Sequence, residues 1–455
     1  MAGYDAETGI LHVPIAIFSA VIAIVITIIC IYKQKSKERI ERQTYDKLFD
    51  SGSSNQEKDN TGDSSATVSK KRAKHVSGKK FPSPPVLSHP LLLTTLKGHT
   101  GDVIDIEFSI NAKYLASTSE DRSVRLWSVK EFKNKEHKYL RVNVELDHGS
   151  RISVSPDIRA FIVSLGQENT IRVFKIGKKA DGSGEITPAY DFPVKHKQEI
   201  IALNIAPTGK YIMSCSKDTT LIIWSLKGEV LCQIDTLQVV NTYAAISPCG
   251  KFVATSGFIS DVKLWEVEFT KSDEYSKVSR AMELKGHKAA VYSFNFSDDV
   301  SKMATVSKDG FWKIWDISVH YRLDQDPRCM MTGSCHTQGF SLIALSPDAR
   351  TVAIASGTRI DFFFAYDAKL DESIDNVHAE VLTAIKWHPS SKYLASSGGN
   401  DRSIRIWYNA TGLKATIIDL TSRLRRATSE TIKERLQLQV DDAKASLAEI
   451  FDKSK

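Results

Sequence analysis

Serine, histidine and aspartate, the three residue types of a hydrolase triad, occur together in this sequence. In the stretch VSKDGFWKIWD, residues 306–316, Ser307 precedes Asp309, and His287 lies 22 residues before that aspartate. Histidine and aspartate occur four times in all at nearly fixed spacing, with the histidine 22 or 23 residues before the aspartate and a tryptophan six residues after it. Because an enzyme carries such a triad once, we interpret the recurring set as structural.

The recurring set belongs to an internal repeat that begins at residue 97. KGHTGDVIDIEFSINAKYLASTSEDRSVRLW (97–127) aligns with KGHKAAVYSFNFSDDVSKMATVSKDGFWKIW (285–315), and further copies span 195–224 and 377–407. Weaker copies fill the gaps, so seven units of about 44 residues cover residues 97–407. Turn residues such as EDR and KDG separate short stretches of alternating polarity, which indicates strands. A period of about 40–45 residues with these Gly-His and Trp marks resembles the WD40 repeat family.

The resemblance implies a fold of four-stranded blades arranged in a ring. We therefore expect an all-β, seven-bladed WD40 β-propeller over residues 91–420. The outer strand of the last blade should come from LLLTTL (91–96) or from LKATIIDL (413–420), and the sequence leaves both open.

In WD40 proteins the histidine, a strand serine, the turn aspartate and the tryptophan form a hydrogen-bonded brace inside a blade, and buried groups of these types need partners. The resemblance implies such a brace in four units here. In the last of them Gly399 takes the position of the serine, so we expect that brace to be incomplete. The brace residues are His99, Ser119, Asp121 and Trp127; His196, Ser216, Asp218 and Trp224; His287, Ser307, Asp309 and Trp315; and His378, Asp401 and Trp407.

Two of the weaker units depart most from the pattern. The fourth carries its aspartate, Asp261, in the longer turn GFISD, and the sixth has Thr358 in place of the acid. We expect looser blades there and predict that loops which bind partners favour these two units.

Motifs of catalysis do not occur in the sequence. It contains no G-x-x-x-x-G-K-[ST], G-x-G-x-x-G, H-E-x-x-H or G-x-S-x-G, and its six cysteines form no C-x-x-C pair. The sequence therefore predicts no enzyme, no metal site, no cofactor and no small-molecule substrate.

Residues 10–32, ILHVPIAIFSAVIAIVITIICIY, form an uncharged run long enough to cross a bilayer as a helix. The preceding head, residues 1–9, carries acids and no Lys or Arg, which argues against a cleaved signal peptide. Five basic residues follow the run and predict that the chain after it is cytosolic; they are Lys33, Lys35, Lys37, Arg39 and Arg42. The sequons at Asn295 and Asn409 would be glycosylated only if this orientation were reversed.

Residues 33–90 are polar and poor in aromatics, which predicts a disordered tether. The net charge of +7 is concentrated here, with 13 Lys and Arg against 7 Asp and Glu in residues 33–80. The run SKKRAKHVSGKK (69–80) is either a solvated spacer or a contact for anionic lipid or RNA phosphates; its basic residues are Lys70, Lys71, Arg72, Lys74, Lys79 and Lys80.

Residues 421–455 are predicted to form one C-terminal helix. Its apolar residues recur at four- and three-residue spacing, as in a coiled coil. The helix either docks on the side of the propeller or binds a partner or a second copy. The apolar residues are Leu436, Val440, Ala443, Leu447 and Ile450.

Stretches such as NIAPTGKYIMSCSKDTTLIIWSLKGEVL and AAISPCGKFVATSGFISDVKLWEV, together with the anchor, resemble a membrane-anchored branch of the WD40 family. That resemblance implies a single-pass protein of the endoplasmic reticulum with a cytosolic propeller. It also implies a role in the unfolded protein response and translational control, with the stress kinase that acts on initiation factor 2 α as partner. We expect a scaffold that assembles proteins at this membrane. The alternative is an RNA- or ribosome-binding membrane protein that uses the basic tether.

Overall fold

The computed structural model describes residues 3–4, 11–12, 88–179, 183–323, 325–337 and 339–452. The propeller and the C-terminal helices belong to one compact unit, while the hairpin tip Lys178–Glu185 and the two N-terminal strands are grouped in another. Each unit is described by itself.

Most of the predicted membrane segment and tether lies outside the described residues. Of residues 10–32, only Leu11–His12 are described, as strand β2 paired antiparallel with β1 (Gly3–Tyr4). The basic residues after the segment and the basic run 69–80 are not described. Among the residues that are, no helix is both long and apolar enough to span a bilayer.

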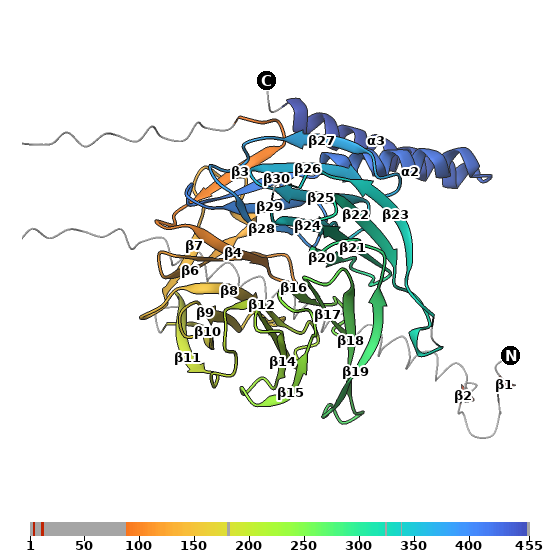
Figure 1. The fold of residues 1–455 in the computed structure, drawn as a ribbon. Coiled ribbons are helices and arrows are strands. Elements are labelled where there is room, and N and C mark those ends of the chain that lie inside the picture. The colour runs from red at the N-terminus through yellow and green to blue at the C-terminus, as the bar shows by residue number, and fades with distance from the viewer. Residues whose placement is uncertain are drawn as a thin grey trace, which may run out of the picture. The chain divides into compact units, whose positions relative to one another are not determined.

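Seven four-stranded antiparallel sheets form the blades of the propeller (Figure 1). Six blades are meanders of consecutive strands whose first strand lies innermost, and the seventh takes its outer strand from the beginning of the propeller. In order from the inner to the outer strand, the blades are β4 (Val103–Phe108), β5 (Tyr114–Ser119), β6 (Ser123–Ser128) and β7 (Tyr139–Asn143); β8 (Gly149–Val154), β9 (Ala160–Leu165), β10 (Ile171–Lys178) and β11 (Gly184–Asp191); β12 (Ile200–Ile205), β13 (Ile212–Ser216), β14 (Thr220–Trp224) and β15 (Val230–Asp235); β16 (Asn241–Ile246), β17 (Phe252–Gly257), β18 (Val262–Phe269) and β19 (Tyr275–Leu284); β20 (Val291–Phe296), β21 (Lys302–Ser307), β22 (Phe311–Asp316) and β23 (Arg328–Ser334); β24 (Ser341–Leu345), β25 (Thr351–Ser356), β26 (Arg359–Phe364) and β27 (Leu370–Ile374); and β28 (Leu382–Trp387), β29 (Tyr393–Gly398), β30 (Ser403–Tyr408) and β3 (Leu92–Lys97).

The ring closes through β3, the first strand of the propeller in the chain. It pairs antiparallel with β30, with Thr95 opposite Arg405, and so becomes the outer strand of the seventh blade. Closure by 91–96 is confirmed, and the alternative strand 413–420 is wrong, because those residues are helical. A closed ring leaves no long sheet edge open to pairing with another chain.

The core lies between neighbouring blades. Every residue of β5, YLASTS, is buried, because both faces of a middle strand pack against another blade. Between the seventh and first blades, for example, Leu96 and Ile404 pack with Leu115 and Trp127 in one apolar cluster. Blade-on-blade packing therefore explains why β5 consists of apolar, small and hydroxyl residues and carries no charge.

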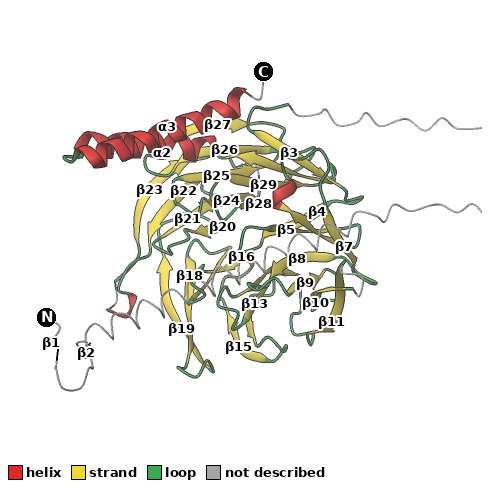
Figure 2. Ribbon diagram, turned by 180° about the vertical axis from the view of Figure 1, so that it is seen from behind, coloured by secondary structure: helices red, strands yellow, loops and turns green. Residues whose placement is uncertain are grey.

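Two C-terminal helices follow the last blade. Helix α2 (Ala410–Arg426) and α3 (Glu430–Asp452) are separated at Ala427, which has extended backbone angles, so the prediction of one helix over 421–455 is wrong. The predicted apolar seam packs inside the chain. Val440, Ala443 and Ile450 are buried, and Ile450 joins the core of the sixth and seventh blades. Docking on the propeller is thereby confirmed (Figure 2).

Candidate functional site

The first blade shows how the recurring set is built. The Trp127 indole N–H donates to Ser117 Oγ at 2.9 Å, and His99 Nε2 lies 2.8 Å from the same oxygen. On its other side, His99 Nδ1 lies 3.0 Å from Asp121 Oδ2. The indole can only donate and the Asp121 carboxylate can only accept, so Ser117 accepts from Trp127 and the Nδ1–H donates to Asp121. In a neutral imidazole Nε2 then accepts the hydrogen of Ser117.

The same brace occurs in three further blades. The shared hydroxyl belongs to Ser214, Thr305 and Ser396, each within 2.9 Å of both the imidazole Nε2 and the indole Nε1. The seventh brace, which we expected to be incomplete, is therefore whole. His287 and His378 lie 3.0 and 2.6 Å from Asp309 and Asp401.

The third blade inserts one more hydroxyl into this chain of hydrogen bonds. His196 Nδ1 is 4.0 Å from Asp218, and Thr220 Oγ1 lies between them, 2.7 Å from the imidazole and hydrogen-bonded to the carboxylate. The predicted histidine and aspartate are thus connected, although not directly.

The serines predicted for the brace have a different role. Ser119, Ser216 and Ser307 accept the backbone N–H of the aspartate two residues later, at 3.1–3.3 Å, and do not contact the tryptophan. The correct hydroxyl precedes each by two residues, on the same face of the strand. A serine or threonine stands 18 residues after the histidine in all four units, which is the signal that finds it.

The electrostatics of the brace match its geometry. Burial lowers the pKa of His99 although Asp121 opposes the shift, and burial lowers the pKa of His196 to about 4. Burial alone would raise the pKa of Asp121, but hydrogen bonds from His99, Ser123 and the Thr100 N–H outweigh it and keep that pKa well below its usual value. The imidazoles are neutral and the hydroxyls are already engaged, so the set stabilises the blade and offers no free nucleophile.

Two blades without the brace replace it with apolar residues. In the second blade Val163 and Phe174 stand where the hydroxyl and the indole stand elsewhere, and in the sixth blade Ile354 and Phe363 do. These blades carry no buried indole N–H at this place and so need no acceptor. The hydroxyl and the indole are thus replaced together in these two blades.

The fourth blade keeps half of the brace. Thr255 and Trp265 have the register of the hydroxyl and the indole, but Leu237 stands four residues before the inner strand, where the braced blades have histidine. Leu237 is exposed, and Gln238 turns inward instead, where it is fully buried and donates to the Asp261 carbonyl. Thr255 Oγ1 and Gln238 Oε1 are left without hydrogen-bond partners.

One face of the propeller carries the loops that cross from blade to blade, together with the turns between second and third strands. On this crossing face the two kinds of loop are joined by backbone bonds, such as Lys217 N–H to Glu199 O and Phe258 N–H to Val240 O. Exposed apolar residues recur on its loops; they are Leu146, Val194, Leu237, Val239, Val240, Phe258, Phe340 and Val381. Four of these eight belong to the edge of the fourth blade.

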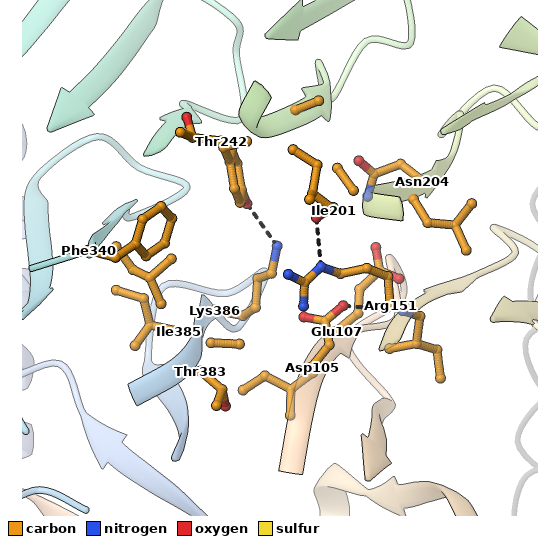
Figure 3. Close-up of a pocket in the computed structure, with 18 residues that line it drawn as sticks. Asp105, Glu107, Arg151, Ile201, Asn204, Thr242, Phe340, Thr383, Ile385 and Lys386 are labelled. Atoms are coloured by element: carbon orange, nitrogen blue, oxygen red, sulfur yellow. Dashed lines mark hydrogen bonds between the residues drawn. The ribbon is translucent and has the colours of Figure 1, made fainter. Parts of the chain in front are cut away.

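The inner strands line a narrow central channel (Figure 3). Its cavity has a volume of about 80 Å³, with Asp105, Glu107, Arg151 and Lys386 among the lining residues. Sites for organic ligands usually measure about 300–1,000 Å³, so this cavity suits a few waters rather than a substrate.

Polar side chains in the channel form hydrogen bonds with backbone N–H and C=O groups on the free edges of the inner strands. Glu107 accepts the Val154 N–H at 2.9 Å, Asp105 accepts the Ile152 N–H at 3.2 Å, and Arg151 donates to the Ile201 carbonyl at 2.6 Å. Each bond joins one blade to the next. The polar lining therefore holds neighbouring blades together.

Glu107 is the channel residue with the most altered acidity. Burial raises its pKa to about 8, and the nearby Asp105 adds to the shift, while Lys386 and the hydrogen bonds oppose it. Its side chain is nevertheless partly exposed to the channel, so water moderates the effect. Within the described parts of the chain, no three His, Cys, Asp or Glu residues cluster as metal ligands would.

Comparison with known proteins places this geometry in a family. The family described as WD domain, G-beta repeat matches residues 91–128, 190–225, 279–316 and 373–408, which contain the residues of the four braces. Transducin beta-like protein 2 of Homo sapiens is 45% identical over 373 residues, covering 81% of this chain and 83% of that protein. The chain belongs to the WD40 family, in the group of transducin beta-like protein 2.

Other WD40 relatives are consistent with this placement. Transducin beta-like protein 2 of Mus musculus is 44% identical over 86% of this chain and 88% of its own length. A WD repeat-containing protein 26 homolog of Arabidopsis thaliana is 24% identical over 69% of this chain and 49% of its own length. The extent of the first two alignments goes well beyond the four matched repeats.

Proposed function

We propose that this WD40 chain is a membrane-anchored scaffold that assembles proteins at the cytosolic face of the endoplasmic reticulum. The observation that carries the proposal is a closed, braced ring whose crossing face exposes apolar residues over several blades. Contiguous exposed apolar surface marks binding sites in soluble domains. The serine, histidine and aspartate residues are committed to the braces, so we infer that the chain acts by binding rather than catalysis.

The orientation of the chain is supported by its sequons. Asn409 is buried, caps helix α2 through the Gly412 N–H at 2.8 Å and donates to the Ser391 carbonyl. Asn295 lies in β20 and accepts the Leu345 N–H at 3.3 Å. A glycan on either side chain would displace these contacts. A propeller of this structure is therefore suited to the cytosol, as the basic residues after 10–32 predict.

Anchoring supplies the mechanism of such a scaffold. A propeller held at a bilayer by a flexible tether confines its partners near that bilayer and raises their effective concentration. Resemblance to the membrane-anchored branch of the family is what suggests the unfolded protein response and translational control. By the same resemblance we propose the stress kinase acting on initiation factor 2 α as a partner.

Protease protection in sealed microsomes tests the proposal. The full chain is translated with microsomes and digested from outside, and its mobility is compared before and after glycosidase. We expect digestion of the propeller and no glycan. A protected chain that carries glycans at Asn295 or Asn409 would place the propeller in the lumen and refute a cytosolic scaffold.

A further inference from the structure

The loop that enters the fourth blade differs from its counterparts in backbone and in side chains. Leu237 and Val239 have φ of 53° and 65°, a left-handed conformation that is costly for a bulky or β-branched residue. Gly257 allows the arrangement, because a Cβ there would lie 2.4 Å from the Val240 carbonyl oxygen and 2.7 Å from the Gln238 side chain. The loop is therefore held in a strained form by its surroundings.

Several hydrogen bonds fix that strained form. The Phe258 N–H donates to the Val240 carbonyl at 3.0 Å, and Lys263 Nζ donates to the Thr236 carbonyl at 2.8 Å. Asn241, which is buried, donates to the Ser216 carbonyl in the neighbouring blade at 2.8 Å. The loop is thus a defined surface that is attached to both adjoining blades.

This defined surface presents apolar side chains to solvent. Leu237, Val239, Val240 and Phe258, here called the blade-4 patch, have exposed fractions between 44% and 66%. The fold would gain from the reverse arrangement, with the apolar residues turned in and a polar residue out. Strain, unpartnered buried oxygens and exposed apolar groups at one place indicate that stability has been given up for binding.

Lysines flank the blade-4 patch on both sides. Lys195 and Lys197 lie on the loop that enters the third blade, and Lys288 and Lys308 lie on the loops of the fifth. All four are exposed, and none is within ion-pair distance of a carboxylate among the residues that the structure describes. Asp218 and Asp309, beside Lys197 and Lys288, have their side chains buried in the braces. Asp235, two residues before Leu237, is also exposed, and its Oδ1 accepts the Leu237 N–H at 2.9 Å. The four lysines outnumber this carboxylate, so the charge around the patch is mainly positive.

We propose that the blade-4 patch binds an acidic protein segment that inserts two or three aliphatic or aromatic side chains between the flanking lysines. The apolar anchors of such a segment would cover the patch, and its carboxylates would pair with Lys197 and Lys288. The proposal rests on the scaffold function and names the chemistry of one of its partners. RNA is the less favoured ligand, because exposed valine, leucine and phenylalanine in a strained loop offer nothing to phosphates.

A random 12-residue peptide library displayed on phage tests this proposal with the full chain in detergent. Selected peptides should be rich in Asp and Glu with Leu or Phe between them. The double variant Val239→Ser/Phe258→Ser should bind them at least tenfold more weakly. Lys197→Glu/Lys288→Glu should weaken binding about tenfold and reduce its dependence on salt. A control for general loss of apolar surface is Leu323→Ser/Tyr366→Ser, on the opposite face, which should bind like the unmodified chain.

The proposal is overturned by any of three results. The first is a library that yields no peptide sensitive to Val239→Ser/Phe258→Ser while that variant keeps the melting behaviour of the unmodified chain. The second is enrichment of basic or uncharged peptides. The third is binding of a single-stranded RNA probe that the lysine variants abolish and the apolar variants leave unchanged. A propeller found in the lumen by the microsome experiment would leave peptide binding intact, so the two hypotheses fail separately.

Discussion

Removing the hydroxyl of Ser117 should destabilise the propeller far more than removing that of Ser119. Both serines are fully buried and lie two residues apart on β5. Ser117→Ala leaves the Trp127 N–H and the His99 Nε2 without partners. An unsatisfied buried group costs about 1–3 kcal/mol, so we expect the free energy of unfolding to fall by about 2–4 kcal/mol. Ser119→Ala loses a single bond from the Asp121 N–H and should cost about 1 kcal/mol.

Two measurements on the full chain in detergent check this difference. Guanidinium unfolding followed by circular dichroism gives the midpoint for each variant. Hydrogen exchange of the Trp127 indole N–H, resolved by NMR, reports the brace directly and should accelerate in Ser117→Ala alone. Equal losses in the two variants, or faster indole exchange in Ser119→Ala, would refute the assignment of the shared hydroxyl. The pair Ser214→Ala and Ser216→Ala repeats the comparison in the third blade.

Four further predictions follow from individual residues. Val239→Gly should raise the free energy of unfolding by about 0.5–1 kcal/mol, because a strain of about 1–2 kcal/mol is relieved against the entropy of glycine, and a lower unfolding midpoint would contradict this. His196 has a pKa of about 4 in the folded chain, below the usual 6.5, so the unfolded chain binds the proton more readily. The neutral His196 therefore contributes about 3 kcal/mol to the free energy of unfolding above pH 6.5, and this contribution is lost as the pH falls towards 4. An unfolding midpoint that does not change between these pH values would contradict the prediction. Glu107 has a pKa raised to about 8 in the folded chain, so its protonated form favours folding and the free energy of unfolding falls as the pH rises from 4.5 to 8. Glutamine cannot ionise, so Glu107→Gln should compare better with the unmodified chain at about pH 8 than at about pH 5. Urea unfolding midpoints of both proteins at the two pH values test this. Replacing the basic residues of 69–80 by glutamine should leave RNA crosslinking unchanged if the run is a spacer, and its loss would favour the RNA-binding alternative.

The sequence predicted the architecture because the repeat period and the turn residues are local signals. Closure of the ring by 91–96 was one of two open choices, and it is decided by pairing between residues some 300 positions apart. LKATIIDL was a plausible strand by composition, but Asn409 caps a helix at that point. Ala427 interrupts what the periodicity suggested was one helix.

The histidine, aspartate and tryptophan of the brace were predicted correctly, whereas its hydroxyl residue was predicted wrongly. Histidine, aspartate and tryptophan are rare enough to align by eye, whereas these strands contain several buried hydroxyls. Ser117 and Ser119 point to the same face, so within one blade the position of the indole on the adjacent strand distinguishes them. From sequence, only the comparison of all four units does so, through the Ser or Thr 18 residues after each histidine. The fourth blade was expected to be irregular from its longer turn. That Leu237 and Gln238 exchange their expected environments depends on tertiary packing against Gly257, which no spacing reveals.

Site-specific photocrosslinking in membranes tests most directly that this chain is an anchored scaffold that binds proteins at its crossing face. A photoreactive phenylalanine analogue replaces Phe258 in one full-length chain and Leu323, on the opposite face, in another. We predict protein adducts at position 258 in membrane fractions, lost when Val239→Ser is added, and few at position 323. Equal adducts at both positions, or none at 258, would contradict the account.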